Sequence, residues 1–396
     1  MLARKFLVRT LTLGPPFLIL ASAGAIHAQQ LVLTNPSRGA RVAEVIEIPL
    51  AEAKKHLQNI ESLVAEDAAT HQQLPTQLYP NAEGTTPNRF LIAVTFSDKN
   101  KLVLNFVPGN NQTTDKPLVY GREAPERKDD FAWENQYVTY RVYGPALEAT
   151  GEITSGIDVW SKRVPNLVID SFYKHDAEGQ RTHNPALSYH KDDGVGLDSY
   201  LVGPSRGCGG TGVYSDGKLW VSNNYTHLKM LSSGPVRFAF ELTYAPWNAN
   251  GIQVNEVKQI SLDAGSHLNK IESTFTFDGG SSIDAAGGLA VHQGAALEKL
   301  DDGSILSVWD TPQDPSADRI ATGLVTLPGE HTTAMELKGN AIVVAHLHSG
   351  DTLKYLAGSG WSKADMPTQQ AWNHYLEQTR IQLLHPLEIR WTKDKK

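Results

Sequence analysis

Cysteine is nearly absent from this sequence: its 396 residues include a single one, Cys208. One thiol cannot form an intrachain disulfide, and it cannot supply the several thiolates of a cysteine-based zinc site. An excess of basic residues is also missing, because 36 lysines and arginines stand against 43 aspartates and glutamates. A protein that neutralises nucleic-acid phosphates needs a basic face, so we expect no nucleic-acid partner.

Familiar catalytic and architectural signatures are missing as well. The sequence has no Gly-x-Ser-x-Gly nucleophile elbow and no His-Glu-x-x-His metalloprotease motif. It has no internal repeat, heptad pattern or evident linker. With 40% hydrophobic and 20% charged residues, it carries enough apolar surface to build a folded core.

The N-terminus has the layout of a secretory signal peptide. Basic residues within Met1–Arg9 precede a short apolar run, Leu11–Ile19, and small residues follow as far as Ala28. We therefore expect residues 1–28 to be removed and residues 29–396 to form one periplasmic or secreted domain. The apolar run is too short to span a bilayer comfortably, and no later stretch is long enough, so we expect no membrane partner after cleavage.

Strand-like segments dominate the rest of the chain. Alternating or buried apolar patterns, separated by Gly, Asn, Asp and Pro, predict strands over 90–96, 101–106, 136–142, 167–172, 218–225, 236–244, 252–262, 270–277, 289–291, 341–347 and 384–391. Helical spacing predicts helices only over 51–69 and 368–383. This pattern favours an all-β fold of antiparallel sheets packed as one large sandwich, with minor helices near the N- and C-termini.

The segment Tyr189–Gly210 is rich in glycine and cannot be an ordinary strand. Glycine permits close approach of a ligand to the backbone, so the polar side chains of this loop are candidates to face a substrate. They are His190, Asp193, Asp198, Tyr200 and Arg206. The alternative is a polar surface loop whose aspartates bond their own turns.

A second candidate lies in the predicted strand Arg237–Tyr244. Period-two alternation places Arg237 and Glu241 on one face and the aromatic residues on the other. If that face lines a cleft, Glu241 could act as a general base and Arg237 could bind an anionic sugar; otherwise the two form an ion pair on a solvated sheet.

Histidines are the side chains best suited to proton transfer near neutral pH. His292 lies in a strand of small and apolar residues, where it either faces a cleft or is a hydrogen-bonded core residue. His346 and His348 point the same way on a predicted strand and are weak candidates to bind a metal together, although no third ligand is evident from spacing. The sequence identifies no cofactor and leaves a metal ion open.

Tryptophans at predicted turns are candidates for sugar contact. Trp247 and Trp361 offer apolar faces to sugar C–H surfaces beside hydrogen-bonding neighbours. The alternative is that each closes one end of the sandwich.

The chain resembles an uncharacterised bacterial family of domains of unknown function that is grouped with galactose-mutarotase-like proteins and associated with the use of pectin-type polysaccharides. The resemblance covers nearly the whole mature chain and is carried by three segments: Trp133-Glu-Asn135 with Arg141-Val-Tyr-Gly-Pro145, the segment 190–210, and Ala357-Gly-Ser-Gly-Trp-Ser-Lys363. It implies a super-sandwich with a concave carbohydrate-binding face, and it adds Trp133 and Arg141 to the candidate substrate contacts.

These observations together predict an exported enzyme that acts on a uronic-acid-containing oligo- or polysaccharide, with a lyase favoured. A lyase must neutralise the uronate, here with Arg206 or Arg237, and remove a neighbouring proton with histidine or tyrosine. The candidate catalytic residues are His190, Tyr200, Glu241 and His292. A glycoside hydrolase using paired carboxylates, a mutarotase or epimerase, and a non-catalytic carbohydrate-binding protein are the alternatives.

Overall fold

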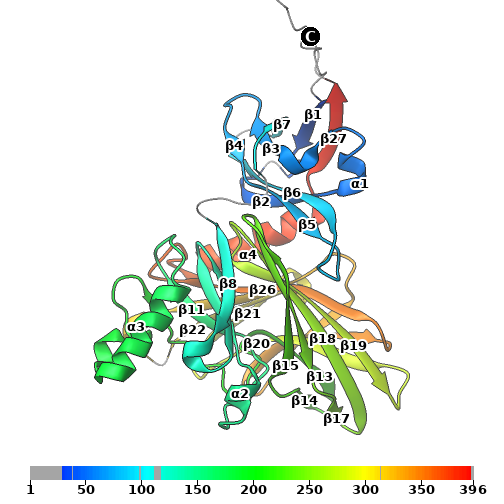
Figure 1. The fold of residues 1–396 in the computed structure, drawn as a ribbon. Helices are drawn as coiled ribbons and strands as arrows, with labels where there is room; N and C mark the ends of the chain where they lie inside the picture. Colours follow the sequence, from blue (N-terminus) through cyan, green and yellow to red (C-terminus); the bar gives the residue numbers. More distant parts are fainter. Residues whose placement is uncertain (1–28, 38, 98–99, 111–116, 313, 394–396) are drawn as a thin grey trace, which may run out of the picture.

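The computed structural model describes residues 29–37, 39–97, 100–110, 117–312 and 314–393. The predicted signal peptide, residues 1–28, lies outside this part of the chain. Within it, every ladder between named strands is antiparallel, and the fold is an all-β sandwich with four α-helices (Figure 1). The predicted all-β fold is confirmed. Among the described helices, none is long and apolar enough to cross a membrane.

The smaller part of the molecule combines the N-terminal strands with the last described strand (Figure 1). Its two sheets have the strand orders β27-β1-β7-β3-β4 and β2-β6-β5, and they enclose a core of their own around Phe90 and Leu104. The strands are β1 (Gln29–Thr34), β2 (Arg41–Pro49), β3 (Leu63–Asp67), β4 (Gln73–Leu74), β5 (Thr76–Pro80), β6 (Pro87–Phe96), β7 (Lys101–Pro108) and β27 (Glu388–Lys393).

The larger part consists of three sheets that share one extended core. The first has the order β12-β11-β10-β9-β8, the second β14-β13-β20-β25-β24, and the third β15-β16-β18-β19-β26-β23-β22-β21, with β17 also paired to β18. Its strands are β8 (Val119–Ala124), β9 (Asp130–Asn135), β10 (Val138–Val142), β11 (Asp158–Lys162), β12 (Gly196–Leu197), β13 (Cys208–Ser215), β14 (Lys218–Trp220), β15 (Tyr225–Ser233), β16 (Arg237–Tyr244), β17 (Trp247–Ala249), β18 (Ile252–Asp263), β19 (Leu268–Asp278), β20 (Ile283–Ala290), β21 (Ala296–Leu300), β22 (Ile305–Asp310), β23 (Ile320–Thr326), β24 (Thr332–Leu337), β25 (Asn340–Leu347) and β26 (Thr352–Trp361).

The helices differ from expectation in two places. The predicted helix over 51–69 is wrong: only α1 (Leu50–Ala53) forms, and Asn59 adopts a left-handed backbone (φ 52°) before the chain enters β3. The predicted strand over 167–172 is also wrong, because helix α3 (Ile169–Thr182) begins there. Helix α3 is therefore a helix that the sequence did not predict.

Two further helices complete the fold. The short helix α2 (Pro145–Glu148) follows β10. The predicted C-terminal helix is confirmed as α4 (Gln369–Leu384), which is capped by the Thr368 hydroxyl and buries Trp372 and Leu376 against β22 and β23.

Charged and amide side chains fasten the two parts to each other. Arg237 binds Asp263 on its own sheet and Glu47 on β2 (2.6 Å). The Gln77 side-chain oxygen (Oε1) accepts from the backbone N–H groups of Val236 and Arg237. The expectation that residues 29–396 form one domain stays a prediction.

Candidate functional site

A pocket of about 270 Å³ opens where three strand ends meet. His292 follows β20, Asp310 ends β22 and Ile320 begins β23. Its lining residues are Tyr200, Leu201, His292, Gln293, Asp310, Thr311, Pro312 and Ile320. Two of the predicted catalytic residues, His292 and Tyr200, therefore meet in one pocket although they are far apart in the sequence.

His292 is held by a partner at each ring nitrogen. Its Nδ1 makes a short hydrogen bond to the Asp310 carboxylate, and its Nε2 lies 2.7 Å from the Leu201 carbonyl oxygen. Because both partners are acceptors, this geometry suits the ring form that donates from both nitrogens, the imidazolium. The hydrogen bond to Asp310 raises the pKa of His292 above its usual 6.5, although partial burial opposes the shift.

Asp310 is the residue that sets this chemistry. Its side chain is 2% exposed, whereas that of His292 is 25% exposed. A buried carboxylate behind a partly exposed imidazole orients the ring and stabilises its protonated form. The pair therefore places an oriented imidazole in the pocket wall, with its Nε2 held by the Leu201 carbonyl oxygen.

Tyr200 contributes its ring to this pocket. The ring meets that of His292 edge to face at a centroid distance of 5.7 Å. The Tyr200 hydroxyl is buried beside that of Thr322, and neither forms a hydrogen bond of normal geometry with another described residue. Burial raises the pKa of Tyr200 well above 10, so the phenol stays protonated and the ring serves as a wall of the pocket.

The rest of the predicted loop is tied to a buried charged cluster, which we call the Arg141 cluster: Arg141, Asp130, Asp158 and Asp198. The Arg141 guanidinium lies 2.5 Å from Asp158 and 3.1 Å from Asp198, and the side chains of all three residues are almost fully buried. Burial, together with the neighbouring Asp158 charge, raises the pKa of Asp198 well above its usual value. Arg141 and Asp198, both predicted substrate contacts, are thus bound to each other inside the protein.

His190 and Asp193 lie on the outside of this loop. The His190 ring is 59% exposed, and its Nδ1 donates to the Asp198 carbonyl oxygen (3.0 Å). The Asp193 carboxylate accepts from the backbone N–H of Val195 and closes a turn, which is the alternative given above for these aspartates.

The predicted arginine partner of the uronate, Arg206, is enclosed by the sandwich. It is 1% exposed and donates to the Ser155 hydroxyl and the Thr211 carbonyl oxygen, both at 3.0 Å. Burial lowers its pKa to about 10. A guanidinium that is enclosed and already bound by the protein is not placed to meet a uronate.

The tryptophans predicted to contact sugar are buried too. Trp133 donates to Asn269 (2.7 Å) within the core, and Trp247 is 8% exposed. Trp361 donates to the Ala317 carbonyl oxygen, while the Arg163 guanidinium covers its ring at 4.6 Å. These three side chains are therefore buried rather than open to a sugar.

Arg237 and Glu241 share a face of β16, as predicted, but they do not pair. Arg237 is engaged by Asp263 and Glu47, and Glu241 accepts from the Gln259 side chain (2.9 Å). His346 and His348 have ring centroids 6.2 Å apart, and each faces one aspartate. Among the described residues, no group of three or more His, Cys, Asp or Glu side chains is placed to hold a metal ion.

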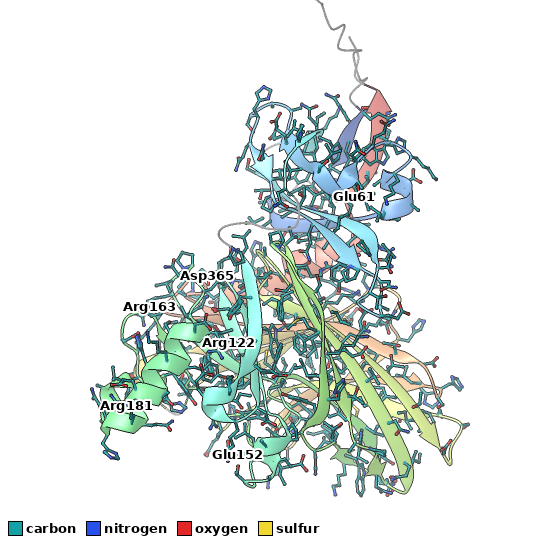
Figure 2. The ribbon with its side chains drawn as sticks, viewed as in Figure 1. Glu61, Arg122, Glu152, Arg163, Arg181 and Asp365 are labelled. Atoms are coloured by element: carbon teal, nitrogen blue, oxygen red, sulfur yellow. The ribbon has the colours of Figure 1, made fainter. Side chains whose placement is uncertain are left out.

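A larger hollow of about 660 Å³ lies between β8 and α3. Its charged side chains bind one another: Arg122 pairs with Glu126 and Asp170, and Arg181 pairs with Glu178. Figure 2 shows Arg122 and Arg181 on the side of the molecule where α3 protrudes. These contacts describe a solvated face, so the His292 pocket is the stronger candidate.

Comparison with known protein families shows the family of this chain. Residues 33–389 match the family model "Domain of unknown function (DUF4861)". The chain belongs to this family. The DUF4861 chain is also similar to "Uncharacterized protein P7" of Formosa agariphila, with 31% identity over 367 residues that cover 88% of this chain and 90% of that protein.

Two solved structures are similar to this chain, and the likeness to the second is one of fold. They are an alpha-mannosidase from Enterococcus faecalis V583 (9% identity, TM-score 0.49) and a protein in the Glycosyl Hydrolase Family 38 from Enterococcus faecalis (8% identity, TM-score 0.50). Each alignment covers 94% of this chain, but only 46% and 48% of the respective solved chains, so the DUF4861 chain spans about half their length. At this identity the likeness is one of fold.

Sequence reasoning missed Asp310. A signal was present: the turn Asp301-Asp302-Gly303 joins β21 to β22 as a hairpin in which Ala296 pairs with Trp309. That register brings Asp310 next to the segment following His292. Arg319 was missed as well; its guanidinium donates to the hydroxyl of Thr311, a lining residue, and so lies at the rim of the pocket.

Proposed function

We propose that this protein is a carbohydrate-active enzyme that cleaves uronic-acid-containing oligosaccharides by β-elimination in the His292 pocket. The observation that carries the proposal is the His292–Asp310 pair on the wall of a pocket that also presents an aromatic ring. The fold shared with a glycosyl hydrolase family member supports the carbohydrate class. The pocket volume, about 270 Å³, suits a single sugar ring.

The proposed elimination uses few groups. For the proposed elimination, His292 first loses its Nε2 proton and turns this nitrogen from the Leu201 carbonyl oxygen toward the substrate. The neutral ring then removes the proton on the carbon next to the uronate carboxyl; the C–H electron pair forms the new double bond as the neighbouring C–O bond breaks. The protonated imidazole then returns the proton to the departing oxygen on the same face of the sugar, so that no other acid is required. The Tyr200 ring offers its apolar surface to the sugar, and Thr311 and Gln293 offer hydrogen bonds.

Arg319 is the residue proposed to face the uronate carboxylate, in place of Arg206 and Arg237. Its side chain is partly exposed and already adjoins the pocket through Thr311. A guanidinium there would stabilise the negative charge that develops on the carboxylate as the proton leaves.

A hydrolase is less compatible with this pocket. Glycoside hydrolysis uses two carboxyl groups on opposite sides of the bond. Among the lining residues, Asp310 is the one carboxylate, and it is occupied by His292.

The test is incubation of the purified protein with oligomers of galacturonate, glucuronate and ulvan, with ultraviolet absorbance of the unsaturated product and reducing ends followed together. We expect absorbance to rise, and His292→Asn to lower the rate by about 100-fold or more. His346→Asn is the matched control, because His346 also pairs with one aspartate (2.8 Å) but lies away from the pocket.

Each other outcome has a meaning. A rate unaffected by His292→Asn removes the pocket from the proposal. New reducing ends without absorbance indicate a hydrolase, and silence in both channels from a folded protein contradicts cleavage and favours an epimerase or a binding protein.

The resemblance described above underlies two further parts of the proposal. We propose that the sandwich is of the galactose-mutarotase-like kind and serves the use of pectin-type polysaccharide. We also propose that the protein is exported to the periplasm or secreted, in keeping with the basic and then apolar pattern of residues 1–28.

A further inference from the structure

A second cavity, of about 560 Å³, lies where the smaller part of the molecule meets the sandwich. Its walls come from β2, from the turn between β18 and β19, and from α4. Figure 2 shows Asp365, a lining residue, at the upper edge of the larger part, below the N-terminal strands. We call this cavity the interface groove.

A histidine–aspartate pair lies in the interface groove. His267 is 2% exposed; its Nδ1 lies 2.9 Å from the Ser359 carbonyl oxygen, and its Nε2 lies 2.8 Å from the Asp365 carboxylate. The Asp365 side chain is 42% exposed, so this carboxylate faces the groove. Partial burial tends to raise the pKa of Asp365, but the hydrogen bond from His267 outweighs this effect and holds the pKa below its usual value.

Aromatic rings fix this pair from two sides. Tyr137 stacks on the His267 ring at 4.4 Å, and Tyr375 meets it edge to face at 5.0 Å. The Tyr375 hydroxyl accepts from the His267 backbone N–H (3.0 Å). The groove therefore presents a rigid aromatic wall beside an ordered carboxylate, as binding sites for sugars require.

The opposite wall is strained. Strand β2 has a bulge between Arg41 and Glu44, in which Ala43 adopts a left-handed backbone (φ 48°) and Val42 is 61% exposed. Gly265 faces this bulge, and a side chain there would collide with Ala43. A non-glycine residue in this conformation costs free energy, and bulges of this kind are common beside binding sites.

The charges of the groove are largely satisfied within the protein. Arg237 is bound by Asp263 and Glu47, and Lys270 lies 3.0 Å from Glu272. A ligand with a charge of its own would have to compete for these partners. Hydroxyl groups would instead donate to the Asp365 carboxylate, which gives charge-assisted hydrogen bonds.

We propose that the interface groove binds a neutral saccharide, with Asp365 accepting from its hydroxyl groups and Tyr137 packing against its ring. The saccharide class rests on the proposed function, but the site and its charge selectivity are separate from the His292 pocket.

The test is isothermal titration calorimetry of the whole protein with cellotetraose, xylotetraose and mannotetraose, and with trigalacturonate as the charged comparison. We expect at least one neutral tetrasaccharide to bind, and Asp365→Asn to raise its Kd by about tenfold, the effect of losing a hydrogen bond to a charged group. Because Asp365 is partly exposed, this variant keeps its fold. Asp278→Asn, at an exposed aspartate on β19, is the control and leaves the Kd unchanged.

Two results would overturn the proposal: no binding of any neutral tetrasaccharide by the wild-type protein, or a Kd unchanged in Asp365→Asn. In the second case, loss of binding in His292→Asn would assign the sugar to the His292 pocket. The elimination assay on uronate oligomers is scored independently, so failure of the groove and failure of the proposed function are told apart.

Discussion

Glu134 and Lys162 form an ion pair whose removal tests how the core holds helix α3. The ammonium lies 2.8 Å from the carboxylate, and both side chains are 0% exposed. The other Glu134 oxygen accepts from the N–H groups of Val168 (2.7 Å) and Ile169 (2.8 Å), so a residue on β9 caps the start of α3. Lys162 also donates to the Asn166 carbonyl oxygen (2.7 Å).

Lys162→Met should lower the free energy of unfolding by about 3–5 kcal/mol, because a carboxylate without a countercharge then stays buried. Glu134→Gln should cost a similar amount, since it leaves the ammonium unpaired while keeping an acceptor for the helix cap. The double variant removes both charges, and we expect it to cost no more than about 2 kcal/mol, the value of the lost hydrogen bonds. The two substitutions should therefore be strongly non-additive.

Equilibrium unfolding in guanidinium chloride, followed by circular dichroism, gives the free energy of unfolding of the wild-type protein, the two single variants and the double variant. Hydrogen exchange at residues 168 and 169 reports the cap: Glu134→Ala should speed exchange there more than Glu134→Gln. Lys55→Met, at an exposed ion pair with Glu52, is the control and should leave the unfolding midpoint in place. Additive costs, or a single variant that costs less than about 1 kcal/mol, would refute this account of the pair.

Three further predictions follow from ionisable groups. His292 must be neutral to accept a proton, so kcat/KM should rise with pH along an acid limb above 6.5. Because the hydrogen bond to Asp310 raises the pKa of His292, Asp310→Asn should move this limb down toward 6.5. A limb that does not move would exclude the His292–Asp310 pair as the catalytic base. Burial raises the pKa of Asp130 from 3.8 to about 6, so its contribution to stability is largest at acid pH and falls, by up to about 3 kcal/mol, as the pH rises through this window. The free-energy difference between Asp130→Asn and the wild-type protein should therefore change between pH 4 and pH 7, and a constant difference would contradict the shift. Cys208 is buried, and burial raises the pKa of its thiol, so a thiol reagent should modify the native protein far more slowly than the protein unfolded in guanidinium chloride.

The strands were predictable wherever one face of a segment is apolar. In β16, Phe238, Phe240 and Leu242 are fully buried, in the alternation that the sequence shows. The helix at 368–383 was predictable because Trp372 and Leu376 recur at helical spacing. Helix α3 was mistaken for a strand because it begins with a short apolar run near Ile169, which resembles a buried strand. The cap that starts the helix comes from Glu134, which is distant in sequence.

The candidate site was predictable in part for a similar reason. His292 was identified from its residue type. The fold brings it next to Tyr200 and Asp310, but the spacing of these three residues in the sequence does not predict that they meet. Arg206 was chosen because its type suits sugar contact and Trp133 because the family resemblance implies it, but neither ground reveals burial. The sandwich uses both as internal hydrogen-bond donors.

The pairing of β1 with β27 has a consequence for biosynthesis. Gln29 lies opposite Lys393 in this ladder, so the five-stranded sheet of the smaller part stays incomplete until the last described strand has left the ribosome. Until then, β1 retains an unpaired edge, and the core around Phe90 stays partly open on that side. The smaller part therefore closes only after translation of the larger one.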